Sequence, residues 1–418
     1  EKSEDRFGVF ERWLLSNGAK FPSLELRKQG SDDEMRGCHS VKPIEDDEII
    51  IQIPLKCLIT VEMGQATDVG RTIMSSGVEL DAPKHIYLML FMLLDRKKPD
   101  SFFKPYYDIL PPTLSNMPIF WTEEEMDYLK GSYVQIQVDD RKMAIDNDYR
   151  VICDISPVFG TLVTKDEFAW ARMCVCSRNF GIQANGIRTA ALVPYADMLN
   201  HLRPRETKWQ FEDSLQSFTV SSLMPIGAGV EVFDSYGQKC NHRFLLNYGF
   251  SVEKNIEPDG YCPNEVPLLM QLSTDDPLYD EKCTRWLRDG YLPSRRIRVS
   301  VGEGDSPKLL MCLLRIICLD EEDFFYIQAH FSGSFRSIRE LNLPINVKNE
   351  TKALIHLGAL CDDYLSRYPT TLAEDIALLA SGNVPEFSNR RNSLIQVKGE
   401  KVVLHHYKEL SEVGLSFL

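Results

Sequence analysis

The sequence predicts an α+β fold, in which short β-strands flank a helical insert and an all-helical C-terminal lobe follows. Residues 49–53 are a β-branched run and residues 218–223 alternate, and both patterns are typical of strands. Helix-capping signals lie between them, and helical patterns return after residue 267. The expected segments are an N-terminal β-containing part (1–67), a helical insert (68–172), a second β-containing part (173–255) and a helical C-terminal lobe (265–418).

The N-terminal part begins with an amphipathic helix. Apolar residues recur at helical spacing over residues 7–14, and Gly18 follows as a terminator. Residues 24–28 and 49–53 predict strands. Residues 34–38 lie between these strands, and we expect them to form a tight turn.

The insert is predicted to be helical throughout. Residues 83–97 indicate a buried helix. Thr122 and Thr164 are each followed three residues later by Glu, which is the spacing of a capping box. Short strands are expected to return from residue 191 to residue 250.

The C-terminal lobe begins after a polar stretch at residues 253–267. Ser306 predicts an N-cap with Pro307 at the first helical position. Thr371 predicts another capping box, and its helix should stop near Gly382. We therefore predict helices and no strands in this lobe.

Composition narrows the classes of function. A net charge of −14 argues against a general nucleic-acid binder, because phosphate neutralisation needs clustered Lys and Arg. The apolar run at 86–94 is about half of the roughly 20 residues that a membrane span requires. The 11 cysteines include no C-x-x-C pair, so we expect free thiols and no metal. We expect a cytoplasmic or nuclear monomer without nucleic-acid or membrane partners.

Three motifs in order are the most informative feature of the chain. They are Pro-Tyr-Ala-Asp-Met-Leu-Asn-His at 194–201, Asp-Ser-Tyr-Gly at 234–237 and Asn-Tyr-Gly-Phe at 247–250. Together they resemble the end of a SET domain. The chain is similar to the group typified by the Rubisco large-subunit lysine methyltransferase, which also contains actin-histidine methyltransferases. The resemblance covers nearly the whole chain and implies S-adenosylmethionine (SAM) as cofactor.

The resemblance also implies a cofactor site. Arg178 suits the SAM carboxylate because its planar fork binds a carboxylate bidentately, and Asn200 offers a donor and an acceptor. Read alone, Asn200 and His201 would form a polar turn, and Phe250 could be plain core. Met35 departs from the Gly that the family has there. The positions carried over are Glu34, Met35, Arg36, Gly37, Glu62, Arg178, Asp197, Asn200, His201, Tyr236 and Phe250.

Tyr236 matches the catalytic tyrosine that the family shares. Read alone, it could equally be a tyrosine packed at a strand end. The reaction is a direct displacement at carbon, so the nucleophile, methyl and sulfur must be nearly in line. A lysine acceptor must also lose its proton, which an apolar channel beside a sulfonium favours.

Three positions bear on the acceptor. Phe180 and Tyr248 match aromatic residues of lysine-directed relatives, and Ala196 stands where histidine-directed relatives have Trp. Histidine-directed relatives have Asn at the position of Phe180. An imidazole acceptor needs a hydrogen-bond partner to fix its tautomer, and Phe180 cannot provide one. These positions predict a lysine N-methyltransferase acting on a non-histone protein bound by the helical lobe. The alternatives are a protein-histidine methyltransferase of the same family and a SAM-binding, non-catalytic interaction module.

Overall fold

The computed structural model describes residues 5–28, 36–302, 304–330 and 337–418. The chain divides into two compact units. The first unit comprises Glu1–Phe120 and Asp139–Gly237, and the second comprises Trp121–Val138 and Gln238–Leu418. Residues 121–138, expected within the helical insert, therefore group with the C-terminal part of the chain.

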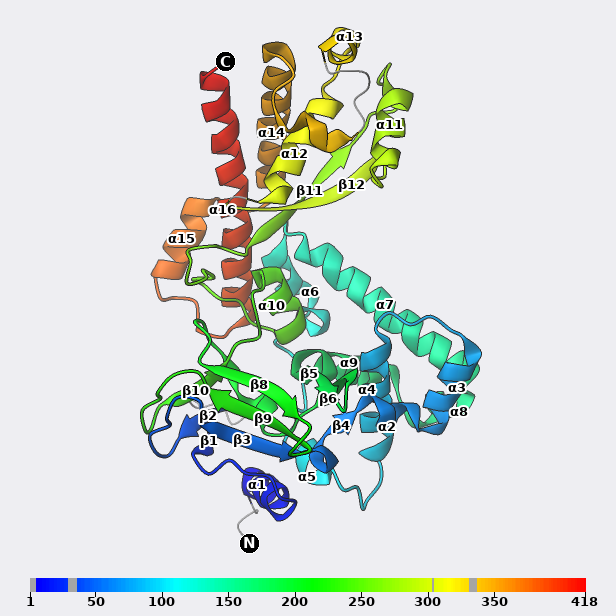
Figure 1. Ribbon diagram of the computed structural model, residues 1–418, viewed down its shortest axis with the longest axis vertical. Coiled ribbons are helices and arrows are strands. Elements are labelled where there is room, and N and C mark those ends of the chain that lie inside the picture. The colour runs from blue at the N-terminus through cyan, green and yellow to red at the C-terminus, as the bar shows by residue number, and fades with distance from the viewer. Residues whose placement is uncertain (1–4, 29–35, 303, 331–336) are drawn as a thin grey trace. The chain divides into compact units, whose positions relative to one another are not determined.

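Short strands of the first unit form three small sheets (Figure 1). In one sheet the order is β1-β2-β10-β7, in another β3-β9-β8, and in the third β4-β6-β5. All pairings are antiparallel except that of β7 with β10. Their bounds are β1 Leu24–Lys28, β2 Arg36–Ser40, β3 Ile49–Pro54, β4 Ile59–Thr60, β5 Asn179–Ala184, β6 Ile187–Leu192, β7 Asn200–His201, β8 Thr207–Glu212, β9 Ser217–Ser222 and β10 Glu231–Asp234.

Helices of the first unit cluster mainly between β4 and β5 in the chain. The predicted buried helix is α4, and the capping box at Thr164 begins α9 as expected. Gly64 is required in α2, because a Cβ there would lie 1.8 Å from the Tyr87 carbonyl oxygen of α4. The helices are α1 Arg6–Ser16, α2 Val61–Gln65, α3 Asp68–Ser76, α4 Pro83–Asp95, α5 Lys104–Tyr107, α7 Val134–Ile155, α8 Pro157–Leu162 and α9 Lys165–Arg178, and α7 crosses the division between the units.

The second unit is mainly helical but contains a pair of strands. β11 (Glu265–Gln271) and β12 (Ser294–Ser300) run antiparallel, which corrects the prediction of an all-helical lobe. In β12 the buried residues Ile297 and Val299 alternate with arginines, and this period of two is the pattern of a strand with one buried face. The helices are α6 Glu123–Met126, α10 Asn241–Tyr248, α11 Tyr279–Arg288, α12 Asp305–Ile317, α13 Glu321–His330, α14 Val347–Ser366, α15 Leu372–Ala380 and α16 Asn389–Ser416.

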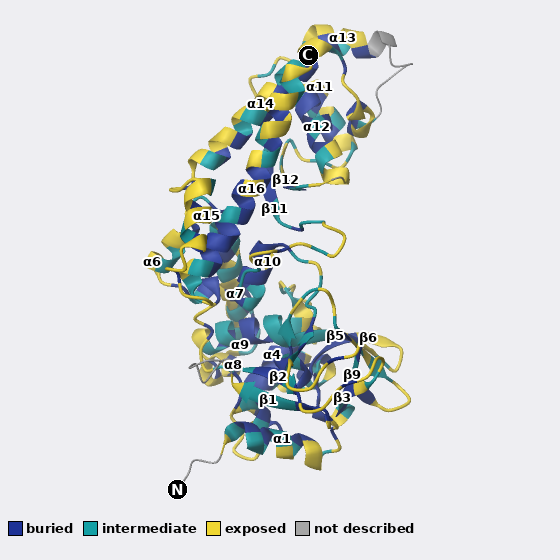
Figure 2. Cartoon of the chain, turned by 90° about the vertical axis from the view of Figure 1, so that its left-hand side faces the viewer, coloured by how far each residue is buried: buried dark blue, intermediate teal, exposed yellow. Residues whose placement is uncertain are grey.

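The core of the second unit forms around α12, α14 and α16. Figure 2 shows buried residues along much of α16, and they include Val403, Leu404 and Tyr407. Arg315 of α12 interrupts an apolar run but is itself buried, because Glu350 of α14 pairs with it. The buried charge of Arg315 is therefore neutralised by an ion pair and not by solvent.

Local predictions were mostly confirmed, with three corrections. Residues 36–38, expected in a turn, lie in β2 because they pair with β1. Residues 241–248, which lie in the region expected to hold short strands, form α10, and Gly249 with φ of 77° ends it. The predicted N-cap Ser306 lies inside α12, whose N-cap is Gly304. The capping boxes at Thr122 and Thr371 were predicted correctly.

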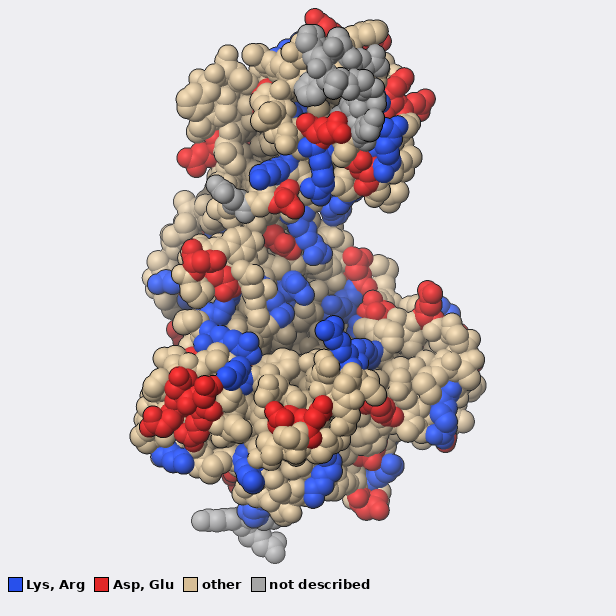
Figure 3. All heavy atoms as spheres, viewed as in Figure 1, with Lys and Arg blue, Asp and Glu red and all other residues tan. Residues whose placement is uncertain are grey.

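The exterior carries both signs of charge. On the face drawn in Figure 3, Lys and Arg occur together with Asp and Glu on both units. None of the helices in the described part of the chain combines the length and apolar character needed to span a membrane.

Candidate active site

The motifs at 194–201 and 234–237 meet in the first unit through the parallel pairing of β7 with β10. Asn200 lies opposite Phe233, and His201 lies opposite Asp234. The chain leaving β10 therefore places Tyr236 beside His201. The Tyr236 backbone N–H donates to Nδ1 of His201 at 3.0 Å, and the two rings stack with centroids 5.1 Å apart.

The Tyr236 hydroxyl is held in place by the first of these motifs. It donates a hydrogen bond of 2.9 Å to the carbonyl oxygen of Leu199, 37 residues earlier. This hydrogen bond fixes the position of the hydroxyl. A fixed position suits a catalytic group that orients reactants.

A buried ion pair connects helix α9 with the segment before β7. Nη1 of Arg178 lies 3.1 Å from Oδ2 of Asp197 and also donates to the Asp197 carbonyl oxygen at 3.2 Å. The Asp197 side chain is fully buried, whereas that of Arg178 is 18% exposed. Burial opposes the charge of Arg178, but the Asp197 carboxylate raises its pKa above the ordinary value. Arg178 therefore stays cationic, and Asp197 positions it.

Tyr106 of the helical insert completes this arrangement. Its hydroxyl donates to Oδ2 of Asp197 at 2.8 Å. Its ring is fully buried, and burial raises the pKa of its hydroxyl well above the ordinary value. Sequence reasoning noted no role for Tyr106. A contact across 91 residues could not be read from spacing.

Asn200 joins β7 to β2. Its Nδ2 donates to the Arg36 carbonyl oxygen at 3.0 Å and to Oε1 of Glu231 at 2.7 Å. Neither bond uses Oδ1, so this oxygen is the atom suited to accept from the ammonium group of a zwitterionic ligand. Glu231 was not among the predicted residues, and only the pairing of β10 with β2 reveals it.

The segment after β1 was expected to approach the cofactor with its backbone. Glu34 and Met35 lie outside the described residues. Gly37 lies in β2 opposite Arg27. The Arg36 guanidinium donates to the Ile109 carbonyl oxygen at 2.6 Å, so the Arg36 contribution to this site is its main chain.

Glu62 lies in the first turn of α2, immediately after β4. Partial burial raises the pKa of its carboxyl, but hydrogen bonds from its own backbone and from Thr60 outweigh burial and lower it. Thr60 and Phe180 both pair with Ala191 of β6, from opposite sides. The sheet β4-β6-β5 therefore brings the start of α2 close to the strand of Phe180.

The predicted acceptor wall in this unit is aromatic. Phe180 contacts Trp209 with ring centroids 5.3 Å apart and Phe218 with centroids 5.0 Å apart, both edge-on. Trp209 and Phe218 were not predicted as part of the site, although both lie in alternating segments. Ala196 is 1% exposed and belongs to a 3₁₀ turn at Ala196–Met198.

Two predicted residues lie in the second unit. Tyr248 is the last residue of α10, and Phe250 follows the helix-terminating Gly249. The Phe250 ring stacks on Phe244 with centroids 5.2 Å apart. Their predicted roles in the substrate channel and at the adenine therefore stay predictions.

The donors and acceptors of the first unit fit the chemistry of SAM. Nε of Arg178 and Oδ1 of Asp197 are buried and make no hydrogen bond to any described residue. A cation and an acceptor amide are what a zwitterionic amino-acid ligand requires. Buried polar atoms without a hydrogen-bond partner are expected where a polar ligand binds.

A family model described as Rubisco LSMT substrate-binding matches residues 273–404. The actin-histidine N-methyltransferase of Homo sapiens is 28% identical over 423 residues, covering 96% of this chain and 68% of that protein. The chloroplastic ribulose-1,5 bisphosphate carboxylase/oxygenase large subunit N-methyltransferase of Nicotiana tabacum is 26% identical over 419 residues, covering 96% of this chain and 81% of that protein.

Solved structures are similar over the whole chain. Rubisco LSMT bound to sinefungin and monomethyllysine matches with a TM-score of 0.82 and 25% identity, covering 99% of this chain and 94% of that one. Rubisco LSMT bound to AdoMet matches with a TM-score of 0.80 and 24% identity, covering 99% and 93%.

The fold and the site define a SET-domain protein with a Rubisco LSMT-type substrate-binding domain. The chain is a homologue of the Rubisco LSMT and actin-histidine N-methyltransferases, and residues 273–404 form a domain of the Rubisco LSMT substrate-binding type. The AdoMet- and AdoHcy-bound structures support SAM as the cofactor. The relatives from Xenopus tropicalis and Homo sapiens are actin-histidine N-methyltransferases. These relatives fit the histidine alternative better than the lysine prediction.

Proposed function

We propose that this chain methylates a side-chain nitrogen of another protein, with SAM as methyl donor. The observation that carries the proposal is the fixed position of Tyr236, whose hydroxyl donates to the Leu199 carbonyl oxygen and whose backbone N–H donates to His201. Bound SAM supplies a methyl group on a sulfonium. Arg178, set by Asp197, would bind the carboxylate of SAM, and Oδ1 of Asn200 would accept from its ammonium group.

The substrate would bind through the second unit. A family model for substrate binding covers residues 273–404, which supports a folded protein as the substrate. A protein held at a separate surface delivers its side chain already oriented, and this lowers the entropic cost of reaching an in-line geometry.

Two acceptors are in question, and different observations support each. The edge-on aromatic contacts of Phe180 favour a lysine, because aromatic faces attract a methylated ammonium by cation–π interaction. Phe180 also offers no hydrogen bond to an imidazole. A histidine acceptor is favoured by the relatives, since the human protein of 28% identity is an actin-histidine N-methyltransferase.

Mass spectrometry of the modified residue decides between the acceptors. The protein is incubated with isotope-labelled SAM and a cell lysate, beside a Tyr236→Phe preparation as the blank. Labelled methyl-lysine that is absent from the blank supports the lysine acceptor, and labelled methyl-histidine supports the histidine acceptor. No transfer to any protein would contradict the proposal and favour the interaction module.

A specificity variant sharpens this test. Phe180→Asn introduces the amide that histidine-directed relatives have at this position. For a lysine acceptor we expect methylation to fall at least tenfold, or about 1.4 kcal/mol in the transition state. Phe102→Asn is the matched control, because Phe102 is an exposed phenylalanine (43%) of the first unit that is not among the predicted site residues. An unchanged or increased rate in Phe180→Asn would contradict the lysine acceptor.

A further inference from the structure

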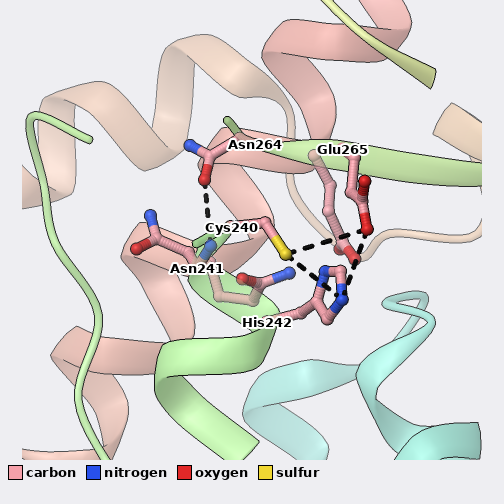
Figure 4. A pocket seen from close by; sticks show the side chains of 7 residues that line it. Cys240, Asn241, His242, Asn264 and Glu265 are labelled. Carbon is pink, nitrogen blue, oxygen red and sulfur yellow. Dashed lines mark hydrogen bonds and ion pairs between the residues drawn. The ribbon is translucent and has the colours of Figure 1, made fainter. Parts of the chain in front are cut away.

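A second cluster of reactive side chains lies in the second unit and takes no part in the proposed reaction. Cys240 is the N-cap residue of α10, His242 lies in the first turn of that helix, and Glu265 begins β11. Figure 4 shows the sulfur of Cys240, the ring of His242 and the carboxylate of Glu265 pointing toward one another. Each of the three offers one atom that can bind a metal ion.

The three atoms have the spacing of a coordination shell. Sγ of Cys240 lies 3.3 Å from Nε2 of His242 and 3.8 Å from Oε1 of Glu265, and these nitrogen and oxygen atoms are 3.6 Å apart. A point equidistant from all three lies about 2.1 Å from each, which is close to zinc–ligand bond lengths of about 2.0–2.3 Å. An ion near this point needs only small shifts of the side chains.

Hydrogen bonding accounts for only part of this arrangement. Cys240 and His242 lie at hydrogen-bonding distance for sulfur, and Oε1 of Glu265 also lies 3.7 Å from Nε of Arg298. The separation of 3.6 Å between Nε2 of His242 and Oε1 of Glu265 is too long for a hydrogen bond. Cys240 and His242 are 5% and 4% exposed, so bulk water does not solvate them.

The wall opposite the three residues offers a further ligand. Gln396 and Glu400 of α16 line the same cavity. Gln396 is 2% exposed, and its Oε1 makes no hydrogen bond within the described part of the chain. This oxygen is a second, independent sign of a missing partner, and it could complete a four-coordinate shell.

We propose that Cys240, His242 and Glu265 bind a divalent zinc-class ion, with Gln396 in the fourth position. A mixed sulfur, nitrogen and oxygen set suits Zn²⁺ rather than Mg²⁺ or Ca²⁺, which prefer oxygen alone. The Cys240 thiolate and the Glu265 carboxylate supply two negative charges to the ion, and Arg298, 3.7 Å from Oε1 of Glu265, shares this carboxylate. Binding releases the thiol proton to solvent, so affinity should fall at low pH.

The consequence is structural. The ion would join the start of α10 to the start of β11, 24 residues later, at a cavity that α16 also lines. The prediction of no metal considered adjacent cysteine pairs only. That prediction did not include this set of residues, because a single cysteine, a histidine and a distant carboxylate have no recognisable spacing in the sequence.

Cobalt spectroscopy on the full chain tests the proposal. Metal is removed with a chelator, and Co²⁺ is then titrated into the wild type and into Cys240→Ser. We expect a thiolate-to-cobalt charge-transfer band that saturates at one equivalent in the wild type and is absent in Cys240→Ser. Cys262→Ser is the matched control, because Cys262 is a half-buried thiol in the same unit outside the cluster, and it should keep the band.

A second variant guards against misfolding of the cysteine mutant. Glu265→Gln keeps the shape of the side chain, and we expect it to weaken Zn²⁺ binding at least about tenfold while the far-ultraviolet spectrum is unchanged. Zn²⁺ should also raise the thermal midpoint of the wild type but not of Cys240→Ser. Absence of the charge-transfer band in the wild type at saturating Co²⁺, or its persistence in Cys240→Ser, overturns the proposal.

Discussion

Arg178 and Asp197 form an ion pair in which the carboxylate is completely buried and the arginine side chain is 18% exposed. The contact is asymmetric, because only Nη1 of Arg178 contacts Asp197. The remaining donors can face a ligand. Asp197 therefore acts through Arg178, and it does not itself need to touch the cofactor.

Replacing Asp197 should affect both stability and SAM binding. In Asp197→Asn the guanidinium loses its counter-charge in a partly buried place. We expect the free energy of unfolding to fall by about 3 kcal/mol and SAM affinity to fall at least about tenfold. Urea denaturation and calorimetric titration measure the two effects. Asp68→Asn is the control, because the Asp68 carboxylate pairs with Arg71 but is 96% exposed; equal losses in both variants would contradict the positioning role.

Removal of the Tyr236 hydroxyl should separate binding from chemistry. Tyr236→Phe loses the hydrogen bond to Leu199 but keeps the ring that stacks on His201. We expect turnover to fall about 100-fold while the SAM dissociation constant changes less than about threefold. Single-turnover kinetics and calorimetry give the two values. Tyr128→Phe, on an exposed tyrosine, should change neither, and an unaltered rate in Tyr236→Phe would remove the hydroxyl from the mechanism.

Arg315 and Glu350 should be essential to the stability of the second unit. Nε and Nη2 of Arg315 donate to the two Glu350 oxygens at 2.6 and 2.8 Å, and both side chains are under 10% exposed. Glu350→Gln leaves a buried cation unpaired, so we expect a loss of about 3 kcal/mol in chemical denaturation. Glu322→Gln breaks a pair whose carboxylate is 81% exposed and should cost less than about 0.5 kcal/mol. Similar losses in the two variants would refute this view of the buried pair.

Stability should fall in mild acid because of His85. Burial, followed by the nearby cations Arg172 and Arg141, lowers its pKa to about 4 and outweighs the opposing charge of Asp81. Neutral His85 accepts from Nη1 of Arg172 at 2.9 Å. Between about pH 6.5 and 4 the unfolded chain therefore binds more protons than the folded one, and unfolding free energy decreases as pH falls.

The size and origin of this decrease can be measured. A shift from 6.5 to about 4 corresponds to roughly 3 kcal/mol, fully present above pH 6.5 and lost progressively toward pH 4. Denaturation of the wild type and of His85→Gln at pH 5 and pH 7.5 tests it. The Gln side chain keeps a hydrogen-bond acceptor but does not titrate in this range. The free energy of unfolding of His85→Gln should therefore depend less on pH than that of the wild type. Parallel curves for the two proteins would assign the acid sensitivity to other groups.

The sequence determined the features that depend on neighbouring residues. The capping boxes at Thr122, Thr164 and Thr371 formed as predicted, because a side chain and a backbone N–H three residues apart meet as soon as a helix begins. The motifs at 194–201 and 234–237 were also visible, because each is a short run whose residue types carry its meaning.

Contacts between distant segments could not be read from spacing. Local patterns did not reveal that Tyr106 binds Asp197 or that β7 runs parallel to β10. The strands β11 and β12 were missed because the segment around them is dominated by helical signals. The helix α10 was missed because eight residues are too few for a clear helical period.

The sequence by itself thus determined the fold class, the helix boundaries set by caps and the residues that resemble a SAM site. Tertiary structure alone decided which of those residues touch, that Asp197 supports Arg178, and that Cys240, His242 and Glu265 converge. The physical reason is that caps and periodicity act within one or two helical turns. Ion pairs and metal ligands depend instead on distances between atoms that the chain brings together only when it folds.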